Sequence, residues 1–131
     1  MNIMAKIDLL KLREALEASW DERTSYLAVK ELGNPALGQC YPTSRVVQHF
    51  FPRTEIVKGQ VWNGKENETH FWNVLKIKDD QYHIDFTWQQ FPHGSRVREY
   101  VVIDRRRLND SEPTVERCEL LLKRVKRYLQ D

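Results

Sequence analysis

The chain has 131 residues, of which 40% are hydrophobic and 31% are charged with both signs mixed. This composition is typical of one globular domain, residues 1–131, with a single hydrophobic core. The net charge of +2 is too small to favour nucleic acid or a membrane surface, and no apolar run approaches the ~20 residues of a membrane span.

The two cysteines, Cys40 and Cys118, are too few for a disulfide framework. The first precedes a helix-like run and the second lies within an apolar stripe, so we expect two free thiols. The first eight residues are charged too early, and their apolar run is too short, for a signal peptide. These features favour a cytoplasmic protein.

Helical patterns fill the first fifty residues. Apolar residues recur at helical spacing over residues 7–19, and a second, short helix is expected over 25–32, closed by Gly33. A third helix is expected to begin near Cys40. Pro42 falls in its first turn, where a missing N–H costs nothing.

From residue 54 onward the pattern alternates as in β-strands. Residues 55–62 form a strand-like run, in which Gly59 is expected to be a bulge. The best strand patterns are residues 69–77 and 82–88, and one more strand is expected over 97–103.

The last element is the clearest helix. Pro113 marks its first turn, with Asp110 or Ser111 as the expected cap. Its apolar residues recur at steps of three and four: Val115, Cys118, Leu122, Val125 and Leu129. The predicted fold class is α+β, with N-terminal helices packed on a small antiparallel sheet and a C-terminal helix added.

The main functional signal is Cys40, which stands at the expected start of a helix. The positive end of a helix dipole and a neighbouring imidazolium both favour a thiolate, which is the nucleophilic form. The Cys40 N–H is a natural oxyanion donor, and the Gln39 amide is a candidate second donor. The alternative, a small cysteine that only packs in the core, is equally compatible with the local sequence.

His70 and Asp85 lie on consecutive predicted strands, where a carboxylate can orient the imidazole. A tight turn at residues 79–80 would place Asp85 opposite Val74, on the face that carries His70. That register separates the two residues by about 13 Å along the ladder. Direct contact therefore requires a wider loop or a bulge.

Other functions have weaker signals. Cys40, His70, His83 and Asp85 are all potential zinc ligands, but none shows the close paired spacing of a metal site. We therefore expect no metal and no cofactor. The basic C-terminal third has acidic residues interspersed, which indicates a solvated helix face and no nucleic-acid partner.

As a set, these motifs make the chain similar to the YunG-like family of small bacterial proteins. The resemblance covers roughly residues 20–128. The matching segments are Gly38-Gln39-Cys40 with Thr43 and Val46-Val47-Gln48, then His70-Phe71-Trp72-Asn73, then Ile84-Asp85-Phe86-Thr87 with Gln90-Phe91, and the C-terminal helix.

More distantly, a cysteine at a helix start followed by His and Asp on strands resembles the papain and transglutaminase-type fold. The resemblance implies that Cys40 is the nucleophile, His70 the general base and acid, and Asp85 the orienting residue. It implies a hydrolase, deamidase or acyl transferase that acts on a small amide, a protein side chain or an acyl donor. Papain-like peptidases carry an oxyanion glutamine several residues before the cysteine, whereas Gln39 is adjacent to it, which leaves the second oxyanion donor open.

Residues that flank the expected triad are candidates for the substrate cleft: Trp72, Asn73, Thr87 and Gln90. The alternative function is a catalytically inactive interaction module that keeps the fold. The pattern specifies neither the natural substrate nor the oligomeric state.

Overall fold

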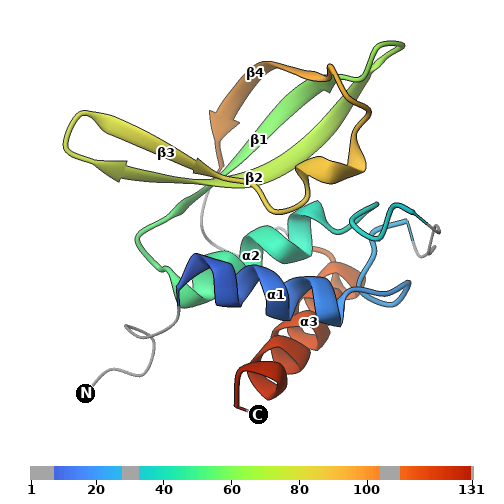
Figure 1. Cartoon of the computed structure of the whole chain (residues 1–131), viewed down its shortest axis with the longest axis vertical. Helices are drawn as coiled ribbons and strands as arrows, with labels where there is room; N and C mark the ends of the chain where they lie inside the picture. Colours follow the sequence, from blue (N-terminus) through green and yellow to red (C-terminus); the bar gives the residue numbers. More distant parts are fainter. Residues whose placement is uncertain (1–7, 28–32, 104–109, 131) are drawn as a thin grey trace.

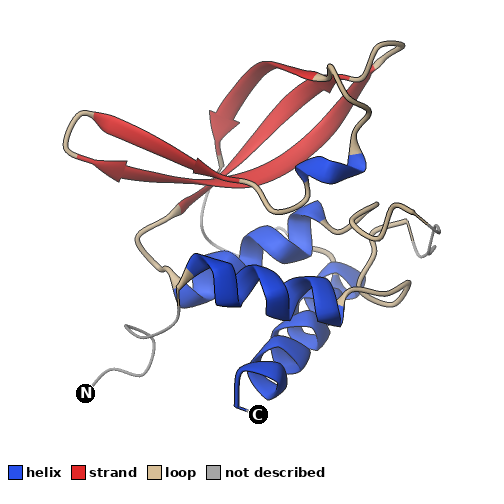
Figure 2. Cartoon of the chain, in the orientation of Figure 1, coloured by secondary structure: helices blue, strands red, loops and turns tan. Residues whose placement is uncertain are grey.

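The computed structural model describes residues 8–27, 33–103 and 110–130. In this part of the chain, three helices pack on a curled antiparallel sheet of four strands in the order β3-β2-β1-β4 (Figures 1 and 2). The predicted α+β class is confirmed. The elements are α1 (Leu9–Ser19), α2 (Cys40–Phe50), β1 (Glu55–Trp62), β2 (Asn67–Ile77), β3 (Asp80–Ile84), the 3-10 helix η2 (Trp88–Gln90), β4 (Arg96–Val102) and α3 (Glu112–Gln130).

Local sequence signals account for the ends of the helices. Asp8 caps α1 by accepting a hydrogen bond from the Lys11 N–H at 2.7 Å. Ser111, one of the two predicted caps of α3, accepts from the Thr114 N–H at 3.3 Å. The helix α2 begins at Cys40, as predicted.

The helix expected over 25–32 is not present in the part of this segment that the structure describes. Residues 28–32 lie outside the described part, and 25–27 form a turn. The Tyr26 N–H is hydrogen-bonded to the Gly38 carbonyl at 2.7 Å, so this turn pairs with a distant segment. A side chain on Gly38 would lie 2.2 Å from the Ser25 hydroxyl, so glycine is needed for this close approach.

The helices lie on one side of the sheet, and α2 contacts both β2 and α3 (Figure 1). No described helix is long and apolar enough to cross a membrane. A small second cluster of Val57, Trp72 and Val74 fills the other face of the sheet. The main core is built from Leu12, Ala15, Leu16, Val46, Val47, Phe50, Ile84, Leu121 and Val125.

The predicted bulge at Gly59 is wrong. The strand β1 is continuous and pairs directly with β2 through Gly59 and His70. The irregularity lies in the pairing with β4, between Gln60 and Val61. Gly59 is needed for space: an added Cβ would lie 2.5 Å from the Trp72 ring.

The β2–β3 hairpin turns through Lys78 and Asp79, because Ile77 pairs with Asp80. Lys78 accommodates this short loop with a φ of +57°. The predicted bounds of the next strand, 82–88, are also wrong. The strand β3 spans Asp80–Ile84, and the chain then leads into η2.

Candidate active site

Cys40 occupies the first position of α2 and is partly exposed. The first N–H groups of a helix have no intrahelical acceptor, so those of Cys40 and Tyr41 are available to an external oxygen. The positive end of the helix dipole also lies here and favours an anion on the cysteine sulfur. The helix start therefore supplies both a nucleophile and nearby donors.

His70 and Asp85 are in direct contact, with His70 Nε2 and Asp85 Oδ2 2.6 Å apart. The register that separated them by about 13 Å is wrong, because His83 and not Asp85 pairs with Val74. This two-residue shift moves Asp85 towards His70. The carboxylate reaches the imidazole because Asp85 follows the last residue of β3 and is released from the strand.

The second carboxylate oxygen of Asp85 is held by Thr87. Asp85 Oδ1 accepts from the Thr87 N–H at 3.2 Å and from the Thr87 hydroxyl at 3.3 Å. Thr87 is itself buried. It therefore orients Asp85. We had expected Thr87 to line a substrate cleft, but its hydroxyl bonds inward to Asp85.

His70 is fully buried among aromatic rings. Trp72 stacks on it with 5.4 Å between ring centroids, while Phe91 and Trp88 approach edge-on at 4.8 and 6.1 Å. Burial alone would lower the pKa of His70. The hydrogen bond that His70 donates to Asp85, hydrogen bonding with Cys40 and the charges of both groups together raise this pKa to about 9. The imidazole is therefore cationic at neutral pH.

The other ring nitrogen of His70, Nδ1, is buried and makes no hydrogen bond of standard geometry among the described residues. Cys40 is nevertheless close enough to raise the pKa of His70. Because Nε2 bonds to Asp85, Nδ1 is the ring nitrogen that remains for the Cys40 thiol. Hydrogen bonds within catalytic pairs are commonly long or poorly aligned without substrate.

The Gln39 side chain is occupied elsewhere. Its amide oxygen accepts from the Thr24 hydroxyl at 2.8 Å, and its amide nitrogen donates to the Asp21 carbonyl at 2.9 Å. Gln39 is buried, so its side chain is a structural tie between the N-terminal loop and α2. Both polar atoms of this side chain thus bond to internal partners.

The remaining cleft candidates are also engaged in internal contacts. The Asn73 amide donates to the Ser44 carbonyl at 3.0 Å and so ties β2 to α2. The Gln90 amide donates to the Thr87 carbonyl at 3.0 Å. The Trp72 indole is 4% exposed and stacks on His70. These side chains therefore hold neighbouring elements together around His70 and Asp85.

A partly buried polar cluster beside Cys40 was not predicted from the sequence. The Tyr41 hydroxyl donates to Asp110 at 2.6 Å and accepts from Arg45 at 2.8 Å. Burial and the hydrogen bond to Asp110 raise the pKa of Tyr41 above its usual range. Because Asp110 is 69 residues from Tyr41, no local pattern predicts this cluster.

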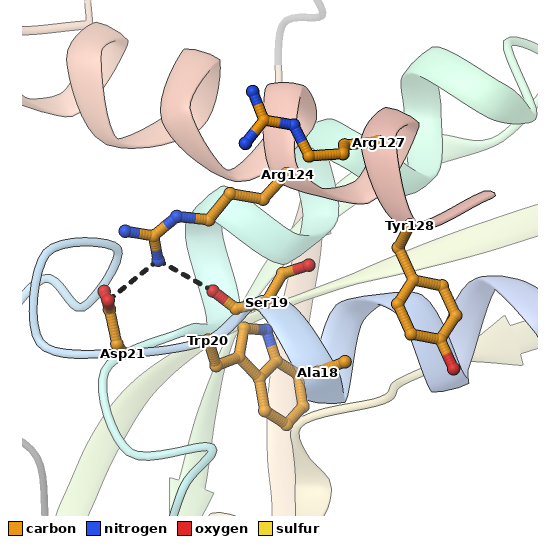
Figure 3. A pocket seen from close by; sticks show the side chains of 7 residues that line it. All are labelled: Ala18, Ser19, Trp20, Asp21, Arg124, Arg127 and Tyr128. Carbon is orange, nitrogen blue, oxygen red and sulfur yellow. Dashed lines mark hydrogen bonds and ion pairs between the residues drawn. The ribbon is translucent and has the colours of Figure 1, made fainter. Parts of the chain in front are cut away.

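A larger hollow, of about 400 Å³, lies between the ends of α1 and α3 (Figure 3). In it Arg124 binds the Asp21 carboxylate and the Ser19 carbonyl, both at 2.9 Å, which fastens α3 to α1. The lining holds neither cysteine nor histidine: Ala18, Ser19, Trp20, Asp21, Arg124, Arg127 and Tyr128.

The space around Cys40, Asp85 and Thr87 is much smaller, and too narrow for a water molecule. Two of the three triad candidates, Cys40 and Asp85, line this smaller space, and His70 bonds to Asp85. Among the described residues, no group of three His, Cys, Asp or Glu side chains is placed to hold a metal ion.

Comparisons with known proteins identify the family. No curated protein matches the chain, and no solved structure matches it. A family model described as YunG protein matches residues 8–130, nearly the whole chain. The chain therefore belongs to the YunG family, as the sequence motifs predicted.

Proposed function

We propose that this protein is a thiol enzyme that transfers an acyl group from an amide or thioester through Cys40, His70 and Asp85. The observation that carries the proposal is the buried His70, which is held by Asp85 at 2.6 Å and interacts with Cys40. A cationic imidazole next to a thiol at a helix start favours the thiolate–imidazolium pair.

In the first step the Cys40 thiolate attacks the carbonyl carbon, forming a C–S bond and an oxyanion. The Cys40 N–H at the start of α2 is the proposed donor that stabilises this oxyanion, and the Tyr41 N–H is a candidate second donor. His70 gives its proton to the leaving nitrogen or sulfur as the bond to the carbonyl carbon breaks. The product is a thioester on Cys40.

In the second step water, or an acceptor amine, attacks the thioester. His70 is then neutral and takes a proton from the attacking group, after which the C–S bond breaks and Cys40 leaves as thiolate. Asp85 keeps the imidazole in one orientation through both steps and balances its charge. Thr87 fixes the Asp85 carboxylate by two hydrogen bonds.

The described part of the chain is one small set of helices on a single sheet, so a small amide, a side-chain amide or a thioester that reaches the partly exposed Cys40 is favoured over an extended peptide. The papain and transglutaminase-type relationship is part of the same proposal. It is supported by the order of the elements, with the cysteine at a helix start and the histidine on a following strand. Asp85 follows the next strand of the sheet.

The proposal is tested with an activated ester, p-nitrophenyl acetate. We expect one acetyl group on Cys40, found by mass spectrometry of the acid-quenched protein and removed by hydroxylamine, as a thioester would be. A Cys118→Ala variant should acylate like the wild type, whereas His70→Gln should acylate at least tenfold more slowly. Equal acylation of wild type and His70→Gln would refute an activated thiol.

The second candidate function is a non-catalytic interaction module. It is favoured by the complete burial of His70 beneath Trp88 and Phe91, which restricts access of a substrate to the imidazole. An absence of acylation, together with iodoacetamide alkylation of Cys40 no faster than that of a simple thiol, would support this alternative.

A further inference from the structure

The face of the His70 ring is covered by the indole of Trp72, with 5.4 Å between centroids and 25° between planes. An aromatic face within about 6 Å of a cation stabilises the charged form. The position of Trp72 therefore affects how readily His70 holds its proton. The titratable groups that act on His70 are Asp85 and Cys40.

Trp72 is positioned by the neighbouring strands. Its ring lies against Gly59 of β1, where an added Cβ would lie 2.5 Å from the Trp72 Cη2 atom. Tyr100 of β4 packs edge-on against the indole, with 5.5 Å between centroids. These contacts hold the Trp72 indole parallel to the His70 ring, but neither of them accepts a hydrogen bond from the indole N–H.

The polar partner comes from β3. The Trp72 Nε1–H donates to Nδ1 of His83 at 2.9 Å, and the His83 ring packs edge-on against Tyr100 at 5.4 Å. His83 is exposed and pairs with Val74, two residues along β2 from Trp72. A surface imidazole is thus connected to the buried one through a single indole.

We infer that His83 is a positioning residue: by accepting the Trp72 N–H, it holds the indole flat against His70 and so helps to keep His70 protonated. This inference rests on the proposed function, in which the His70 imidazolium pairs with the Cys40 thiolate. His83 itself takes no part in the chemistry. If its bond to Trp72 only stabilised the sheet, the titration of His70 would not respond to its loss.

The test is an NMR titration of the His70 ring, whose signal is assigned among the four histidines by its absence in His70→Gln. In His83→Ala we expect the His70 midpoint to fall by about half to one pH unit, which is a three- to tenfold lower ratio of charged to neutral imidazole at a given pH. His83→Gln, whose amide oxygen accepts the same N–H, should keep the wild-type midpoint. Tyr82→Ala, which removes the adjacent exposed ring of β3, is the matched control.

A double-mutant cycle with Trp72→Phe adds a second readout. If His83 acts through the indole N–H, then His83→Ala should have no further effect on His70 in the Trp72→Phe background. An unchanged midpoint in His83→Ala, a His83→Gln variant that behaves like His83→Ala, or additive effects in the cycle would each overturn the inference. The proposed function fails separately, if wild-type Cys40 forms no acetyl thioester, because the titration does not depend on turnover.

Discussion

Replacing Asp85 with asparagine is expected to lower the pKa of His70 from about 9 to its ordinary value of about 6.5 or below. Burial of His70 opposes the charged form, and the hydrogen bond and charge of Asp85 are the main features that overcome it. At pH 7.5 the charged imidazole outnumbers the neutral one by about 30 to 1 in the wild type, whereas in the variant most of the molecules would carry a neutral ring. Acylation of Cys40 at this pH should fall about ten- to a hundredfold.

The same shift predicts how stability depends on pH. Because the folded pKa of His70 is raised above its unfolded value, its protonation stabilises the fold fully below about pH 6.5, and this contribution is lost as pH rises through about 9. A difference of about 2.5 pH units corresponds to about 3 kcal/mol in the free energy of unfolding. Asp85→Asn should lack this dependence.

The assays are an NMR titration of His70 and urea unfolding at about pH 6 and pH 9.5. Asp80→Asn, which removes an exposed carboxylate at the start of β3, the strand that precedes Asp85, is the matched control and should behave like the wild type. A His70 midpoint that stays above about pH 8 in Asp85→Asn would refute the reasoning, because Asp85 would then not be what holds the proton.

Three further substitutions test the supporting structure by urea unfolding. Gln39→Ala should cost about 1–2 kcal/mol, since it removes two hydrogen bonds of a buried amide, while the Thr24 hydroxyl and the Asp21 carbonyl keep their bond to each other. A loss below about 0.5 kcal/mol would contradict this. Arg124→Ala should cost about 1 kcal/mol at neutral pH. Burial would raise the pKa of Asp21, but the Arg124 hydrogen bond and other contacts hold it below its usual value. The part of the cost that comes from the ion pair should therefore disappear as pH falls through that pKa, while the bond to the Ser19 carbonyl remains. Gly59→Ala should destabilise by about 1–3 kcal/mol by displacing the indole beneath it, and an unchanged near-UV spectrum would count against that contact.

The sequence alone determined the elements whose signals are local. The start of α2 at Cys40 follows from the apolar periodicity and from Pro42 in the first turn. The cap of α3 follows from Ser111 just before Pro113. The order of Cys40, His70 and Asp85 was also enough to select the triad candidates, because each residue type has few alternatives in that chemistry.

The contact between His70 and Asp85 was decided by the tertiary structure. A two-residue turn at Lys78 and Asp79 sets the register of β3, and the strand ends at Ile84. A change of one or two residues in either feature moves the carboxylate by several ångströms. Such a change alters no apolar pattern, so the sequence left the distance open.

Tertiary structure also decided which polar residues support the site. Gln39, Asn73 and Thr87 were expected to face a substrate, yet their partners are internal and, for the first two, 15 to 29 residues away in the chain. A buried amide or hydroxyl must find a hydrogen-bond partner, but the sequence does not say which one. Only the packing of the loop before α2 and of the sheet against that helix brings those partners within reach.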